Sequence, residues 1–224
     1  MSDFSKVKGV LFDLNGIITD SWAYHSKSWQ EIAAQLGIAW SSQLEEAIKG
    51  RDRIDSLNAI LAAGGMADHF SADQKEALAD KKNAIYQTML DKMNPGDILP
   101  GIMAFLDELV ANHYKIIIAS ASANAPKEIR KLQLESYFPL IVDLKEIKHN
   151  KPAPDVFAKA AGMLHLAPDE CVGIDDGMVG VESINAAGIV SIGVGDPKVL
   201  KEAAINFMTT RELTLANIAQ AWPK

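Results

Sequence analysis

Short apolar runs alternate along this chain with longer stretches in which apolar residues recur at helical spacing. The short runs have the length and the flanking turn residues of buried β-strands. They cover residues 10–12, 115–119, 140–142, 171–174, 189–194 and, as an edge strand, 205–208. Helices are predicted between them over residues 99–110, 125–137, 154–164 and 178–187. Strands separated by helical crossovers predict a parallel sheet with right-handed connections.

Residues 21 to 93 contain no such strand-like run and are predicted to be entirely helical. Ser21 is a plausible N-cap, and apolar residues recur at helical spacing from Tyr24 until Gly37 ends the run. Trp22 and Trp29 in this helix are expected to pack within the helical block instead of touching a ligand. Three more helices are predicted over residues 42–48, 55–63 and 71–93, the last beginning with a capping-box pattern.

The chain is therefore predicted to be an α/β protein with a Rossmann-like parallel sheet core and an inserted all-helical cap domain. Residues 1–20 and 94–224 would form the core, and residues 21–93 the cap. Because the cap is inserted directly after the first strand, we expect it to lie over the carboxyl end of the sheet as a lid. Ligands of open α/β sheets bind at that end.

Composition narrows the classes of function. The 224 residues are 48% hydrophobic, which suffices for a sizeable core, and the net charge is −7. The acidic balance argues against nucleic acid as a partner. Cys171 is the only cysteine, so the chain can form no internal disulfide. No apolar run has membrane-spanning length, and no leader segment is evident. We expect a cytoplasmic, monomeric protein that acts on a small molecule.

Polar residues follow the predicted strands at positions where chemistry would occur. Asp13 ends the first strand, and a carboxylate there can act as a nucleophile, a base or a metal ligand. Ser120 follows the second strand, where its hydroxyl and the first amides of the predicted helix can bind an anion. Lys151 precedes Pro152, so its backbone is expected to be extended and its side chain free to reach the cleft.

Asp175 and Asp176 follow another strand as adjacent carboxylates. Two neighbouring negative charges repel each other unless a cation offsets them. Magnesium is the natural candidate, because it binds through one or two carboxylates together with substrate phosphate. Each of these residues has an ordinary structural explanation alone, as a turn former, a helix cap or a solvated lysine. Their joint occurrence at the strand ends predicts a metal-dependent site.

These segments together resemble the four motifs of the haloacid-dehalogenase superfamily of phosphoryl-transfer enzymes. Within it, the chain is similar to the β-phosphoglucomutases. The similarity rests on residues 13–20, His25, the cap segment from Lys49 to Leu57, residues 119–122 and residues 151–157. The cap segment discriminates most, because general phosphatases of the superfamily do not need it.

The resemblance implies a role for each matching residue. Asp13 would be the nucleophile that becomes an aspartyl phosphate, and Mg²⁺ would be held by Asp13, the Asn15 carbonyl, Asp175 and Asp176. Ser120, Ala121 and Lys151 would hold the transferring phosphate. Arg53, with Ser122 and Asn124, would bind the other phosphate of a sugar bisphosphate. The remaining substrate-binding residues would be Thr19, His25, Lys49, Gly50, Ser56 and Lys82.

The chain departs from this family at three positions. Asn15 stands where the family has an aspartate that acts as general acid and base, and an amide in that role predicts a loss of roughly 10²–10⁴-fold in turnover. Ala123 replaces a lysine of the phosphate loop, and Asp175 replaces a commoner glutamate. The sequence does not show whether Asn15 is native or a substitution.

Several functions remain open at this point. The leading hypothesis is a phosphomutase that interconverts β-D-glucose 1-phosphate and D-glucose 6-phosphate through glucose 1,6-bisphosphate, with turnover impaired by Asn15. The alternatives are a sugar-phosphate phosphatase with the same core and a non-catalytic sugar-phosphate-binding protein. A haloacid dehalogenase ranks last, because Lys49 and Arg53 suit a phosphate.

Overall fold

A computed structural model describes residues 3–223 and shows an α/β fold built on a five-stranded parallel sheet. The strand order is β2-β1-β3-β4-β5. The strands are β1 (Gly9–Phe12), β2 (Lys115–Ile118), β3 (Cys171–Asp175), β4 (Val190–Val194) and β5 (Ile205–Phe207). All four pairings are parallel, so every strand ends at the same edge of the sheet. The parallel α/β core predicted from the sequence is confirmed.

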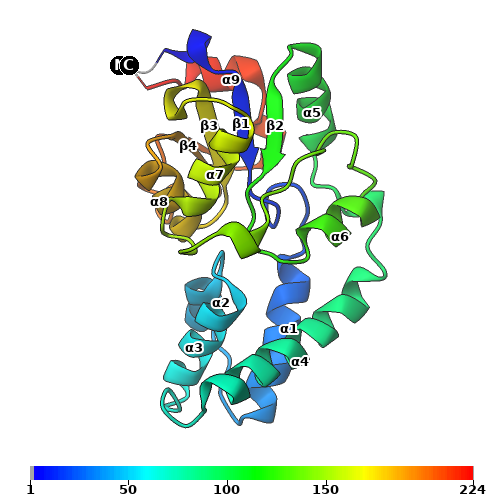
Figure 1. The fold of residues 1–224 in the computed structure, drawn as a ribbon, viewed down its shortest axis with the longest axis vertical. Helices are drawn as coiled ribbons and strands as arrows, with labels where there is room; N and C mark the ends of the chain where they lie inside the picture. The colour runs from blue at the N-terminus through cyan, green and yellow to red at the C-terminus, as the bar shows by residue number, and fades with distance from the viewer. Residues whose placement is uncertain (1–2, 224) are drawn as a thin grey trace.

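The helices fall into two groups in Figure 1. Four of them form a block below the sheet: α1 (Trp22–Gln35), α2 (Ser42–Ile48), α3 (Arg53–Ala63) and α4 (Ala72–Leu90). The others flank the sheet: α5 (Ile102–Ala111), α6 (Ala125–Lys131), α7 (Asp155–Met163), α8 (Met178–Ala186) and α9 (Leu215–Gln220). No helix within residues 3–223 has the length and apolar character that crossing a membrane requires.

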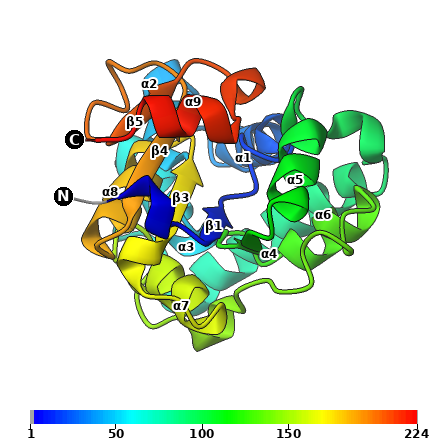
Figure 2. The same ribbon diagram turned by 90° about the horizontal axis from the view of Figure 1, so that it is seen from above.

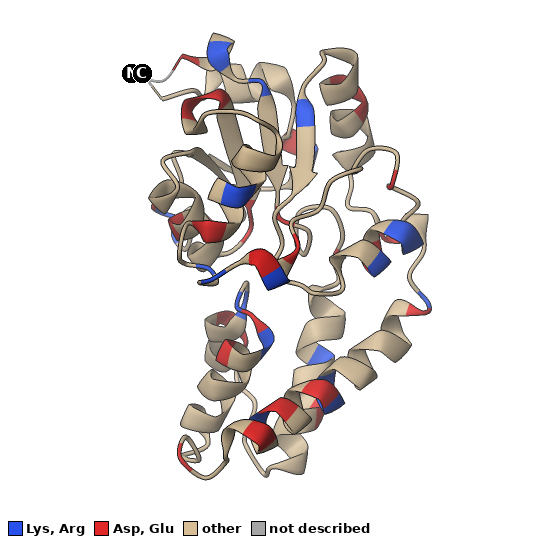
Figure 3. Ribbon diagram, in the orientation of Figure 1, with Lys and Arg blue, Asp and Glu red and all other residues tan. Residues whose placement is uncertain are grey.

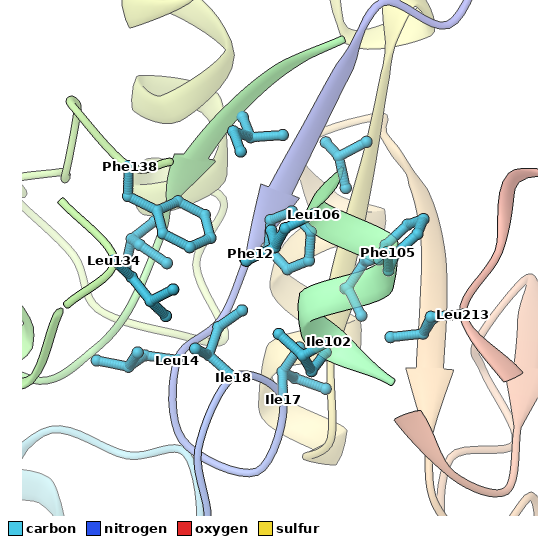
Figure 4. Packing of buried hydrophobic residues seen from close by; sticks show 14 of the residues in the cluster. Phe12, Leu14, Ile17, Ile18, Ile102, Phe105, Leu106, Leu134, Phe138 and Leu213 are labelled. Atoms are coloured by element: carbon cyan, nitrogen blue, oxygen red, sulfur yellow. The ribbon is translucent and has the colours of Figure 1, made fainter. Parts of the chain in front are cut away.

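Helices cover both faces of the sheet and bury strand β1 on both sides. Successive side chains of a strand point to opposite faces. Phe12 belongs to one hydrophobic cluster with α5 and α9, and Leu11 belongs to another with α7 and α8. Figure 2 shows these helix pairs on different sides of the sheet. In Figure 4, Phe12 packs between Phe105 and Phe138, with ring centroids 6.0 and 5.6 Å away.

The four-helix block has a hydrophobic cluster of its own. Trp29 and Ile32 of α1, Ile48 of α2 and Leu57 of α3 are all buried in it. Helix α4 packs along α1 and begins with the predicted capping box, in which Ser71 and Gln74 each accept a backbone hydrogen bond from the other. Residues of both charge signs lie along the N-terminal half of α4 (Figure 3), and Asp73, Asp80 and Lys81 among them are exposed.

Two local predictions are wrong. Residues 140–142 form no strand, and only an isolated bridge joins Ile141 to Ile118. Helix α6 ends at Lys131 instead of continuing to residue 137, because Gln133 adopts a positive φ of 60° and turns the chain. Ser21 occupies the N-cap position of α1, as predicted, but its side chain makes no capping hydrogen bond, because the hydroxyl is bonded elsewhere.

Candidate active site

The sheet register places Asp13 at the centre of the site. Strand β1 lies between β2 and β3, with Phe12 paired to both Ile118 and Ile174. The Asp13 amide donates to the Ile174 carbonyl at 2.9 Å, one residue past the end of β1. Asp13 therefore lies beside Asp175, the last residue of β3, and beside the loop that follows β2.

Lys151 joins two of the carboxylates. Its Nζ lies 2.7 Å from Oδ1 of Asp13 and 2.8 Å from Oδ2 of Asp175. The Lys151 side chain is 1% exposed and lies over the Phe157 ring, so the ion pairs are shielded from water. Burial opposes the charged form of Lys151, but the two carboxylates outweigh it and raise the pKa of its ammonium group.

The third carboxylate belongs to Asp176, which pairs with Lys49 at 2.7 Å. Lys49 lies at the end of α2, so this ion pair joins the helical block to the sheet edge. Gly16, at φ +83°, faces Asp176 so closely that a Cβ there would lie 2.0 Å from Oδ2. A glycine is therefore required at this turn both for its backbone conformation and for space.

Burial sets the protonation of these groups. Burial, opposed by Lys151, raises the pKa of Asp13 to about 7. In the same way, burial outweighs Lys49 and raises the pKa of Asp176 to about 6. Both effects express the cost of placing several carboxylates in one shielded site without a matching number of cations.

The carboxylate cluster fits a divalent cation. One oxygen from each of Asp13, Asp175 and Asp176 lies within 4.8 Å of the others. Carboxylate oxygens are the donors that Mg²⁺ prefers, and the two lysines leave one of the three charges unpaired. A Cβ at Gly180 would lie 1.9 Å from Cγ of Asp175, so the start of α8 packs directly against this carboxylate.

One pocket gathers most of the residues predicted from the sequence. Its lining includes Asp13, Asn15, His25, Lys49, Gly50, Arg53, Ser56, Lys82, Ser120, Ala121, Ser122, Asn124 and Asp176. Lys151 and Asp175 do not line it but lie against Asp13. Thr19 is buried away from the lining, and its hydroxyl donates to the Asp97 carbonyl at 2.8 Å. Thr19 thus holds the loop after β1 in the fold and has no contact with the pocket.

The loop after β2 separates Ser120 from the next helix. Helix α6 begins at Ala125, as predicted. The Ser122 amide donates to Oγ of Ser120 at 3.1 Å, which folds residues 120–124 into a compact turn. Asn124 reaches across to α4, where it bonds to Asn83 and Gln87. The loop thereby joins the sheet edge to the helical block.

A chain of contacts crosses the pocket from α4. Nζ of Lys82 lies 2.7 Å from Nδ1 of His25, whose Nε2 lies 3.4 Å from Nδ2 of Asn15. Lys82 is 1% exposed and lies over the rings of Trp29 and Tyr86. Burial and nearby Arg53 lower the pKa of Lys82 to about 7, and burial also lowers the pKa of His25. Both groups therefore shed their protons more readily than they would in water.

Some residues of the site are absent from the sequence prediction. Trp22 and Trp29 belong to the hydrophobic cluster of the helical block, as expected, and both also line the pocket. Arg51 also lines it, in a segment whose basic character the sequence does reveal. Ser21 and Glu128 lie behind the pocket with their side chains fully buried. A single glutamate in a helix gives no signal in the sequence that it is buried.

Comparison with known proteins agrees with this geometry. The sequence model of the haloacid dehalogenase-like hydrolase family matches residues 10–194. A β-phosphoglucomutase from Bacillus subtilis is 38% identical over 96% of this chain and 96% of its own length. A fructose-1-phosphate phosphatase from Escherichia coli is 28% identical over 85% of this chain and 98% of its own length. The crystal structure of a β-phosphoglucomutase from Clostridium difficile has a TM-score of 0.92 at 35% identity, covering 96% of both chains. The predicted resemblance to β-phosphoglucomutases is confirmed.

Proposed function

This chain belongs to the haloacid dehalogenase-like hydrolase family, and on that premise we propose that it is a phosphomutase acting on a hexose phosphate. The proposed reaction interconverts β-D-glucose 1-phosphate and D-glucose 6-phosphate through an aspartyl phosphate and glucose 1,6-bisphosphate. The similarity to the two β-phosphoglucomutases supports this choice of substrate.

One observation carries the proposal. Asp13 shares a single pocket with basic side chains from the helical block, Lys49 and Arg53 among them. A sugar bisphosphate carries two phosphates, so its site needs a cation near the nucleophile and another at a distance from it. Lys151 meets the first need, and Arg53 meets the second with a planar guanidinium that binds phosphate oxygens in pairs. A phosphatase that binds a single phosphate has less use for the second cation.

In the proposed reaction, a carboxylate oxygen of Asp13 attacks the phosphorus of the bisphosphate. The bond from phosphorus to the sugar oxygen breaks, and that oxygen takes up a proton from the side chain at position 15. The phosphoenzyme then transfers its phosphoryl group to the 6-hydroxyl of a β-D-glucose 1-phosphate, whose proton passes to the side chain at position 15, and glucose 1,6-bisphosphate is regenerated. Such transfer depends mainly on positioning and on stabilisation of charge. Ser120 and Lys151 would bind the phosphoryl oxygens during transfer.

We further propose that Asp13, Asp175 and Asp176 hold Mg²⁺ together with the Asn15 carbonyl. The clustered oxygens and the unbalanced charge support this assignment. Bound there, the ion would neutralise charge on the transferring phosphoryl group.

We propose also that residues 21–93 act as a cap domain over the sheet edge. The Lys49–Asp176 ion pair and the contacts of Asn124 with α4 are the interactions that would hold it closed. A closed cap excludes water, so the phosphoenzyme would react with a sugar hydroxyl instead of being hydrolysed. His25, Gly50, Ser56 and Lys82 would contact the sugar from the cap side.

The experiment supplies purified protein and its Asn15→Asp variant with β-D-glucose 1-phosphate, Mg²⁺ and a catalytic amount of glucose 1,6-bisphosphate. Formation of D-glucose 6-phosphate is followed by a coupled dehydrogenase, and free phosphate is measured in parallel. Isomer in excess of phosphate is expected. Absence of isomer with both proteins contradicts the mutase.

The phosphatase alternative draws support from the fructose-1-phosphate phosphatase that matches most of this chain. It predicts free phosphate in excess of isomer from the Asn15→Asp variant in the same assay. Tight binding of the bisphosphate without either product would instead favour a sugar-phosphate-binding protein.

A further inference from the structure

We propose that Trp22 stacks on one face of the sugar ring and thereby makes the site specific for a pyranose phosphate. The inference rests on the proposed function, because it identifies the residue that recognises the sugar between the two phosphate positions. Trp22 is the first residue of α1, is half-buried, and lines the same pocket as Asp13. The reaction described above gives this side chain no role.

The pocket has charged groups for the phosphates of a sugar bisphosphate and needs an apolar surface for the ring between them. Asp13 and Lys151 lie at the sheet edge, and Arg53 lines the pocket from the helical block. A pyranose ring carries its hydroxyl groups around its edge, whereas the C–H bonds on its faces are apolar. These C–H bonds complement the electron-rich face of an aromatic ring. The ring should therefore be recognised by an aromatic side chain of the pocket.

Three of the described residues that line the pocket have aromatic rings, and two of these rings are already engaged. Trp29 is only 2% exposed, and Nζ of Lys82 lies 5.2 Å from the centroid of its ring. The centroid of the His25 ring lies 4.0 Å from that of Tyr86. Nδ1 of His25 also lies 2.7 Å from Nζ of Lys82. Trp22 is the third aromatic residue, and it is more exposed than Trp29.

The indole of Trp22 is held in place but keeps its hydrogen-bond donor free. Its ring lies at 23° to the His25 ring, with centroids 6.4 Å apart, and packs against the hydrophobic cluster of the helical block. Within residues 3–223 its N–H donates to no acceptor, whereas Trp40 of the same cluster donates to Glu45 at 3.3 Å. A partly buried indole N–H usually has a partner. The N–H of Trp22 is therefore available to an oxygen of the sugar phosphate.

Stacking on a fixed indole distinguishes a ring from an open chain. A pyranose is rigid and presents a flat apolar face. An acyclic polyol phosphate with the same number of carbons has no such face, and it loses more conformational freedom when it binds. Trp22 should therefore strengthen the binding of pyranose phosphates and contribute little to the binding of acyclic ones.

Isothermal titration calorimetry with D-glucose 6-phosphate and D-glucitol 6-phosphate tests this selectivity. Mg²⁺ is present and bisphosphate is omitted, so the mutase reaction has no phosphoryl donor. The two ligands have equal numbers of carbons and phosphates, but only glucose forms a ring. We expect Trp22→Leu to weaken the binding of D-glucose 6-phosphate about tenfold, and that of D-glucitol 6-phosphate less than about threefold. Trp22→Phe keeps an aromatic face and should retain most of the affinity for D-glucose 6-phosphate.

Trp40→Leu is the matched control. It removes a second half-buried indole from the same hydrophobic cluster, outside the described lining of the pocket, and should change neither affinity. Leucine keeps an apolar side chain in the cluster, and thermal unfolding shows whether each variant folds. Intermolecular NOEs between the C–H protons of bound D-glucose 6-phosphate and the indole protons of Trp22 give a second readout. Packing within the helical block alone would not produce these NOEs, and the native chain suffices to measure them.

Equal weakening of both ligands by Trp22→Leu, or no weakening of D-glucose 6-phosphate, would overturn the role of Trp22 and leave the proposed mutase standing. A native chain that binds D-glucitol 6-phosphate at least as tightly as D-glucose 6-phosphate would do the same. Should Trp22→Leu fail to fold, the absence of the NOEs in the native chain overturns the role, and their presence supports it. Failure of the native chain to bind either ligand overturns the proposed function and the role of Trp22 with it.

Discussion

The ammonium nitrogen of Lys151 lies 2.7 Å from a carboxylate oxygen of Asp13, although 138 residues separate the two in the chain. Both side chains are buried, and Asp175 shares the same ammonium group. Removing one partner of a buried ion pair leaves an uncompensated charge. This contact therefore links the stability of the fold to the nucleophile of the proposed reaction.

Replacing Lys151 by Met should destabilise the protein by about 3–5 kcal/mol in the presence of a chelator, because two carboxylates lose their cation. Urea unfolding measures this loss. Mg²⁺ should restore part of it, since the ion would neutralise the same carboxylates. Lys148→Met, which removes an exposed lysine of the same loop, is the control and should change the free energy of unfolding little. An equal effect of both substitutions would contradict the prediction.

Removal of Mg²⁺ should stop turnover and lower thermal stability. An ion that binds only the folded state stabilises it by about 2.7 kcal/mol at a concentration 100 times its Kd. Asp176→Asn should abolish most of this gain, because it removes one of the three clustered carboxylates. Differential scanning calorimetry with and without Mg²⁺ makes the measurement. Asp169 is exposed, so the Asp169→Asn variant should keep the full stabilisation by Mg²⁺. Loss of that stabilisation in Asp169→Asn would show that the ion binds elsewhere.

Asn15→Asp should raise kcat by about 10²–10⁴-fold, because a carboxyl group transfers a proton more readily than an amide. The coupled assay for D-glucose 6-phosphate gives the rate. KM should change much less than kcat, since the two side chains have nearly the same size. A kcat that does not rise would mean that proton transfer at position 15 does not limit turnover.

Substitution by alanine at two helical glycines should change the free energy of unfolding in opposite directions. At Gly180 of α8 the new Cβ would lie 1.9 Å from Cγ of Asp175, so Gly180→Ala should cost about 1–3 kcal/mol through overpacking and weaken Mg²⁺ binding. At Gly162 of α7 nothing lies within 4 Å, so Gly162→Ala should stabilise the protein by about 1 kcal/mol. Chemical denaturation of both variants provides the comparison. A stabilising Gly180→Ala substitution would contradict the packing described here.

The lowered pKa of Lys82 should make the free energy of unfolding depend on pH. Burial lowers the pKa of its ammonium group from 10.5 in the unfolded chain to about 7 in the fold. Between these values the unfolded chain binds the additional proton, so stability rises with pH through this interval. Below about pH 7 the cost of burying the charged group is fully present.

Lys82→Met removes this cost. The variant should therefore gain most stability over the native chain below about pH 7, and the gain should shrink as the pH approaches 10.5. Urea unfolding across this range tests the trend. The neighbouring exposed Lys81→Met variant removes a charge from the same helix and should show no such trend. A constant difference at every pH would mean that folding does not lower the pKa of Lys82.

Apart from the strand predicted at residues 140–142, the sequence by itself determined the order of strands and helices along the chain and the candidates for chemistry. Buried parallel strands need continuous apolar runs, and the polar residue after each run must lie at the sheet edge. Asp13, Ser120 and Asp175 were identified in this way. The capping box at Ser71 and the helical block after β1 also follow from local patterns that need no tertiary contact.

Only the tertiary structure decided which residues share the pocket and in what state. Thr19 belongs to the same motif as Asp13, yet its hydroxyl turns to the Asp97 carbonyl. Ser21 has the local signature of a helix cap, but a carboxyl group 107 residues away takes its hydrogen bond. Burial and long-range pairing set these outcomes, as they set the pKa of Lys82 and Asp13. Local sequence specifies neither burial nor long-range pairing, because both depend on which distant segment packs against the residue.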